Sequence, residues 1–125
     1  MINITKYEEI AKTKDEERFK EISPSLYWAY FGSKRAGSED INLDDVKWDW
    51  EIEPIIKECK EYGIEQFTFS STWSGAIKII WEFVKRGCTV VGMKEVPIDR
   101  WTINYKTDQE EQEKVPAIII KMPKA

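Results

Sequence analysis

The pattern of apolar and polar residues is most regular in the middle of the chain. At residues 67–70, two phenylalanines alternate with a threonine and a serine, which is the two-residue period of a β-strand. A polar turn follows, and four apolar residues then recur at helical spacing: Ile77, Ile80, Trp81 and Val84. Gly87 ends this run, and residues 89–93 form a second predicted strand. A strand, a helix and a strand in this order predict a parallel pair joined by a right-handed crossover.

The residues before this unit predict helices. Residues 5–12 predict one short helix, and residues 15–22 continue as a charged helical segment. Ser23 and Pro24 match the N-cap and the first residue of a third helix, which is nearly all apolar. This third helix is predicted to end near Gly37, because glycine readily adopts the left-handed conformation that closes a helix.

A polar stretch separates these helices from the next one. Residues 38–47 predict a loop, with or without a short extended piece. Asp49 is placed to cap a helix over residues 51–62, which Gly63 ends. Four apolar residues form the predicted buried face of that helix: Ile52, Ile55, Ile56 and Cys59.

The C-terminal part predicts a β-hairpin. Residues 96–97 are expected to end the preceding strand, because proline cannot donate a hydrogen bond within a sheet. Residues 101–106 alternate and predict a half-buried strand, and residues 107–114 predict a charged loop. Residues 117–122 are almost continuously apolar, which predicts a central strand buried on both faces. Residues 115–122 and 101–106 are therefore expected to pair.

Together these elements predict an α/β fold, with α+β as the alternative. N-terminal helices precede a β-α-β unit and a C-terminal β-hairpin, and the strands form a small mixed sheet of about four strands in a two- or three-layer arrangement. A chain of 125 residues without a dividing linker predicts a single domain, residues 1–125.

Composition narrows the class of function. The net charge of −4, with both signs mixed along the chain, argues against a nucleic-acid-binding protein, which needs a basic patch. The chain contains no apolar run long enough for a membrane span, and its N-terminus has no signal-peptide core. Cys59 and Cys88 fall at apolar positions of different elements, which predicts two reduced, buried thiols. We therefore expect a cytoplasmic protein.

The absence of histidine is the most restrictive feature of the composition. It removes Ser-His-Asp and Cys-His catalysis and the histidine-based metal sites. Two separated cysteines are also too few for a cysteine-rich zinc site. An enzyme would have to rely on carboxylates, Lys, Tyr, Ser or Mg²⁺, so we expect a non-catalytic protein without a cofactor.

The first candidate site is the polar turn after the strand at residues 67–70. It consists of six residues: Ser70, Ser71, Thr72, Trp73, Ser74 and Gly75. The turn is expected to lie between the carboxyl end of a strand and the amino end of a helix that begins near Trp73. Free amides and the helix dipole there can hold a phosphate or a carboxylate. Alternatively, Ser71 or Thr72 only caps the helix.

The second candidate is Trp48, Asp49 and Trp50. Two tryptophans beside acidic residues can form a recognition surface for a protein. The carboxylates of Asp44, Asp45 and Asp49 can also hold Mg²⁺. The alternative is purely structural, with Asp49 as a helix cap and one tryptophan buried.

A third candidate is the aromatic helix that precedes Gly37. It combines aromatic and basic residues: Tyr27, Trp28, Tyr30, Phe31, Lys34 and Arg35. Such a combination can stack nucleotides. An aromatic stripe at helical spacing is also typical of a hydrophobic core, with the basic residues at the negative end of the helix.

Three stretches between about residues 41 and 96 resemble an uncharacterised family of small proteins. These are residues 42–46 (NLDDV) with Trp48, residues 62–75 (YGIEQFTFSSTWSG) and residues 87–88 (GC). The family occurs in Firmicute genomes, prophages and conjugative elements, and it is labelled a domain of unknown function. The resemblance implies a cytoplasmic context and a role in a mobile element, and it transfers no activity or catalytic residue.

These observations lead to three hypotheses. The first is a protein-interaction or accessory protein of bacterial or mobile-element origin that regulates or inhibits a host system. The second is a small-ligand-binding domain that uses residues 70–75. The third, a Mg²⁺-dependent enzyme, has the least support. An aromatic-rich chain can also form a homodimer through a tryptophan patch.

Overall fold

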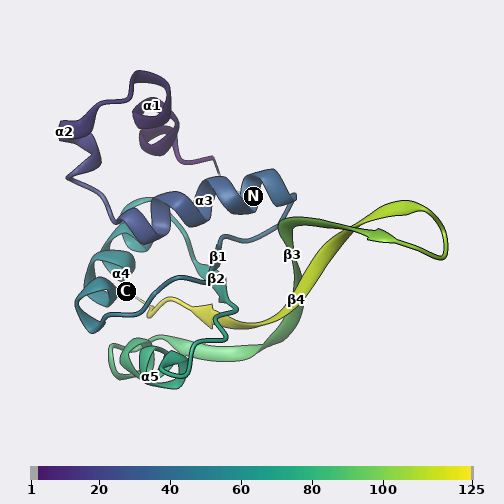
Figure 1. Ribbon diagram of the computed structural model, residues 1–125. Coiled ribbons are helices and arrows are strands. Elements are labelled where there is room, and N and C mark those ends of the chain that lie inside the picture. Colours follow the sequence, from purple (N-terminus) through teal and green to yellow (C-terminus); the bar gives the residue numbers. More distant parts are fainter. Residues whose placement is uncertain (1–2, 125) are drawn as a thin grey trace.

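The computed structural model describes residues 3–124 and confirms a mixed α/β fold (Figure 1). The α-helices are α1 (Thr5–Thr13), α2 (Glu16–Phe19), α3 (Pro24–Ala36), α4 (Ile52–Glu61) and α5 (Ala76–Lys85). A 3₁₀ turn, η1 (Asp49–Glu51), precedes α4. The strands are β1 (Asn42–Leu43), β2 (Gln66–Phe69), β3 (Thr89–Asn104) and β4 (Gln109–Lys121). None of the helices within residues 3–124 is both long and apolar enough to cross a bilayer.

The four strands form one sheet in the order β1-β2-β4-β3. β1 is parallel to β2, whereas β4 is antiparallel to both of its neighbours, β2 and β3. The direct pairing of β2 with β3 that the sequence pattern predicted is therefore wrong, because β4 lies between them. The reason is the apolar run of β4: it needs a neighbour on each side, and it takes the central position predicted for residues 117–122.

The C-terminal hairpin is confirmed, but it is much longer than predicted and the predicted pairing of residues 101–106 with residues 115–122 is wrong. Residues 101–104 pair with residues 109–112, and residues 115–121 pair with residues 89–96. β3 continues through Pro97, with irregular register between Val90 and Gly92 and again between Pro97 and Trp101. Residues 109–114, predicted to be loop, belong to β4. A ribbon exposed on both faces accepts charged side chains in its strands, and Pro97 is tolerated because β3 is an edge strand.

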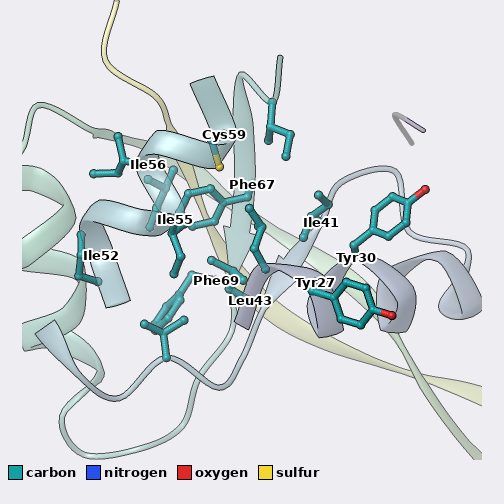
Figure 2. Close-up of a cluster of buried hydrophobic side chains, with 14 of the residues drawn as sticks. Tyr27, Tyr30, Ile41, Leu43, Ile52, Ile55, Ile56, Cys59, Phe67 and Phe69 are labelled. Atoms are coloured by element: carbon teal, nitrogen blue, oxygen red, sulfur yellow. The ribbon is translucent and has the colours of Figure 1, made fainter. Parts of the chain in front are cut away.

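Two helices cover the sheet from opposite sides (Figure 1). α3 packs along β1 and β3, and the Ser33 hydroxyl accepts a hydrogen bond from the Asn42 backbone at 2.9 Å. On the other side, Phe83 of α5 meets Phe67 of β2 edge-to-face, with ring centroids 5.2 Å apart. α3, α4, α5 and the sheet thereby share one hydrophobic core, part of which is shown in Figure 2.

The buried residues of α5 differ from those that the sequence pattern indicated, whereas those of α4 agree. In α5, Ile77, Trp81 and Val84 are exposed, and the buried face is instead Ala76, Ile79 and Phe83. Both sets have helical spacing, so periodicity alone could not choose between them. The predicted buried face of α4 is confirmed, and Cys59 and Cys88 are buried free thiols as predicted.

The helix starts differ from prediction as well. α5 begins at Ala76 rather than near Trp73, and its N-cap is Gly75 without a side-chain cap, so neither Ser71 nor Thr72 caps it. Asp49 does not cap α4 but begins η1. The N-cap of α4 is Glu51, which makes no side-chain cap bond to that helix. Its carboxylate instead closes the start of η1, where it accepts hydrogen bonds from the backbone amides of residues 47 and 48 at 3.1 Å each.

Candidate functional site

The turn formed by residues 70–75 uses its polar groups within the chain. The Ser70 amide donates to the Leu43 carbonyl at 3.0 Å. The Ser70 hydroxyl oxygen accepts from the Asn42 side-chain amide at 2.9 Å, and the Ser71 hydroxyl oxygen accepts from the Trp73 amide at 3.2 Å. The two bonds of Ser70 extend the β1–β2 pairing into the turn, and the bond between Ser71 and Trp73 lies within the turn.

Trp73 covers the start of α5. A β-carbon added to Gly75 would lie only 2.3 Å from the Trp73 ring, so the indole rests directly on the N-cap residue. Ser74 and Thr72 are exposed. The Trp73 indole thus covers the helix start at which an anion was expected to bind. Anion binding at residues 70–75 stays a prediction.

A pocket with a volume of about 630 Å³ lies between α3, the segment after β1 and residues 97–100. Trp28 and Trp48 both line it, together with Asp44 and Asp45. Two sites predicted separately, the aromatic helix and the segment at residue 48, therefore meet here. Asp49 and Trp50, the other members of the second candidate, are not part of its lining.

The charges around this pocket are mostly paired. Lys47 lies 3.5 Å from Asp45, and Arg100 lies 3.6 Å from Glu113. Asp44 has no ion-pair partner within the part of the chain that the structure describes. The loss of water around Asp44, and then the nearby charge of Asp45, raise the pKa of the Asp44 carboxyl.

The magnesium hypothesis is not supported by this arrangement. Across residues 3–124, no three side chains of the types Asp, Glu, Cys or His lie close enough together to hold a metal ion. Asp49 lies in η1, apart from the pocket that Asp44 and Asp45 line. The three carboxylates thus do not converge as a metal site requires.

The aromatic helix α3 divides its side chains between core and surface. Tyr27 and Tyr30 are buried and surround Tyr7 edge-to-face, at centroid distances of 5.6 and 5.5 Å. Trp28 instead points into the pocket and is exposed. Lys34 pairs with Glu8. The core interpretation of this helix is therefore correct for the two tyrosines and in part for Phe31, which packs against the core while half-buried, whereas Trp28 is exposed at the pocket.

Sequence reasoning missed the surface that projects furthest. The distal part of the hairpin of β3 and β4 extends away from the rest of the molecule as a twisted ribbon (Figure 1). Its residues 99–111, almost all of them exposed, are here called the arm. Trp101, Ile103 and Tyr105 are all exposed on it, Tyr105 to 93 %. The strand predicted at residues 101–106 is present through Asn104 as the end of β3, but its predicted half-burial is wrong. The charged and polar residues 106–111 were the available evidence in the sequence that this hairpin is exposed, since such side chains cannot face a core.

All six tryptophans lie at the surface, with exposed fractions between 41 and 69 %. The core takes its aromatic rings from tyrosine and phenylalanine instead: Tyr7, Tyr27, Tyr30, Phe67, Phe69 and Phe83. Tryptophan is the largest apolar side chain and is enriched at binding hot spots. The exposure of all six tryptophans therefore favours a binding role for the surface.

Comparison with known proteins identifies the family to which the chain belongs. Searches of curated proteins and of solved structures found no match. A family model described as "Domain of unknown function (DUF7698)" matches residues 25–122. The match extends beyond residues 41–96, where the resemblance was found. It includes Trp28 of α3, residues 48–50 and the arm, whereas α1 and α2 precede it. The chain therefore belongs to the DUF7698 family of uncharacterised domains.

Proposed function

We propose that this chain is a non-catalytic protein-interaction protein that presents its arm to a protein partner. The observation that carries the proposal is the exposure of Trp101, Ile103 and Tyr105 on a ribbon that projects from the body. Trp101 and Ile103 are two residues apart in β3, so they share one face of the ribbon. Tyr105 follows at the start of the turn.

The arm has no core of its own to account for these side chains. A two-stranded ribbon is marginally stable in water unless something packs on it. The base of the arm is fixed by contacts with the C-terminal end of α3: Arg35 pairs with Asp99 at 3.0 Å, and the Gln112 side chain donates to the Ala36 carbonyl at 2.7 Å. An anchored base and an uncovered apolar face favour a docking role for the distal part.

The exposed edge of β3 adds a second means of recognition. β3 is the outer strand of the sheet, so one side of its backbone is free to pair with an added strand. Main-chain pairing along the edge would supply affinity, and the aromatic residues beside it would supply specificity.

The proposed biological role is that of a cytoplasmic accessory or regulatory protein of bacterial or mobile-element origin, which inhibits or regulates a host system. The resemblance to proteins of prophages and conjugative elements supports this context. The lack of histidine and of a three-ligand metal cluster within residues 3–124 fits a role exerted by binding rather than by chemistry.

Replacing the three arm residues together, as W101S, I103T and Y105S, is expected to abolish partner retention and leave the fold intact. All three side chains are exposed, so the free energy of unfolding should change by no more than about 1 kcal/mol. The measurement compares proteins retained from cells of the native host by the wild-type and variant chains, alongside urea unfolding of each.

The matched control is the pair I77T and W81S, which removes exposed apolar residues from α5 instead. The proposal requires a partner that the wild type and this control retain and the arm variant loses. Retention of the same proteins by all three chains would refute it, as would retention of none by the wild type. If the retained protein is a second copy of the chain, the arm mediates a homodimer.

A further inference from the structure

The pocket beside the arm has the walls of a recognition site. It is formed by three separate parts of the chain, which are α3 between Pro24 and Ser33, β1 with the segment after it, and the base of the arm. Its volume of about 630 Å³ falls within the usual range for ligand pockets, roughly 300–1,000 Å³. This is more space than one side chain fills, so a short peptide segment fits the pocket better than a single functional group.

Two indole rings line this space and are held differently. Trp28 packs against Tyr27, with ring centroids 4.9 Å apart, and against Phe19 at 6.2 Å. These contacts restrict the ring before any ligand arrives, which lowers the entropic cost of binding. Trp48 lies just before η1, where its amide donates to the Glu51 carboxylate at 3.1 Å. Both tryptophans line the pocket, and each is more than half exposed.

The charge that remains available in the pocket is negative. Glu51 is occupied, because its other oxygen accepts from the Ser25 hydroxyl at 2.5 Å. Asp45 has a lysine neighbour, whereas Asp44 has none among residues 3–124. An anionic ligand would have to displace Arg100 from Glu113 or Lys47 from Asp45. A cationic ligand needs to break no existing pair.

We propose that this pocket binds an arginine or lysine side chain on a short segment of the protein partner, between Trp28, Trp48 and Asp44. A cation beside indole faces is attracted by their negative π-surfaces. A carboxylate at the same place adds a charge-assisted hydrogen bond. The inference rests on the proposed function, because it assigns the part of the partner that lies next to the arm.

The test is an NMR titration of the full chain that follows the six indole N–H signals. The probe is a capped tripeptide with a central arginine, Ac-Ala-Arg-Ala-NH₂, and the control is the same peptide with neutral citrulline. The W28F, W48F and W81F variants assign three of the signals. We expect the arginine peptide to shift the signals of Trp28 and Trp48 and to leave that of Trp81 unchanged.

The D44N variant should weaken binding of the arginine peptide about tenfold. The D108N variant is the matched control, since it removes the same charge from the turn of the arm, and it should bind like the wild type. Equal shifts with citrulline, unchanged affinity in D44N, shifts of these indoles with inorganic phosphate, or no shift up to about 10 mM peptide would each overturn the inference.

The two proposals fail separately. If the peptide leaves Trp28 and Trp48 unmoved while the arm variant still loses its partner, the cation pocket is wrong and the interaction function stands. If the arm variant retains every protein that the wild type retains, the interaction function is wrong regardless of the peptide result.

Discussion

Replacing Phe67 by alanine is expected to lower the free energy of unfolding by about 3–5 kcal/mol. Phe67 is fully buried in β2 and packs edge-to-face on Phe83 of α5, so its removal leaves a cavity between sheet and helix. Domains of this size have a total stability of about 5–15 kcal/mol, so a large share would be lost. Urea unfolding followed by circular dichroism measures the change.

The control for this substitution is I77A on the same helix–strand unit. Ile77 is 80 % exposed, so its truncation should change the free energy of unfolding by no more than about 0.5 kcal/mol. A large loss in I77A together with a small loss in F67A would show that α5 turns its opposite face to the sheet, and the described packing would be wrong.

Replacing Glu58 by alanine is the second large expected loss, about 3 kcal/mol. The Glu58 carboxylate is buried in α4 and joins two other parts of the chain. It accepts a hydrogen bond from the Tyr7 hydroxyl of α1 at 2.7 Å and another from the Ser23 amide at the start of α3. Alanine would leave two buried donors without a partner, and urea unfolding would show the cost.

The E58Q variant separates the hydrogen bonds from the charge. Glutamine keeps the shape, accepts from Ser23 and can donate to the Tyr7 oxygen, so a loss of only about 1 kcal/mol is expected. If E58A is no less stable than E58Q, the buried bridge between α1, α3 and α4 is not what holds these helices together.

The same carboxyl predicts a pH dependence. Burial raises the pKa of Glu58, although the hydrogen bonds from Tyr7 and Ser23 act in the opposite direction. A carboxyl whose pKa is higher in the folded chain binds its proton more tightly there. Its contribution is fully present below the ordinary glutamate pKa of about 4.3 and is lost as pH rises through the folded-state pKa. Since glutamine does not titrate, E58Q should remove this part of the fall in the free energy of unfolding with rising pH, which urea unfolding at several pH values measures.

Much of the fold followed from local pattern. The alternation at residues 67–70, the proline after Ser23 and the glycine stops at residues 37 and 63 each act within a few neighbouring residues, and the elements they predicted are present. The continuous apolar run at residues 117–122 also predicted a central strand correctly. Each of these features favours one local structure over the others, so it could be interpreted from the sequence alone.

The failures arose where the outcome depends on distant parts of the chain. α5 is apolar on two faces, and only its packing against Phe67 decides which one is buried. The insertion of β4 between β2 and β3 depends on residues that follow β3 in sequence. The pocket could not be predicted either, because Trp28 and Trp48 belong to separate elements that tertiary packing brings together.

The most direct test of the binding role of the arm is photo-crosslinking from adjacent positions on its two faces. A p-benzoylphenylalanine introduced at Ile103 lies on the apolar face of β3, and the same residue at Thr102 lies on the opposite face, both being exposed. In cells of the native host, the account predicts a discrete covalent adduct with one protein from position 103 and little from position 102. Equal labelling from both positions, or no adduct from position 103, would contradict it.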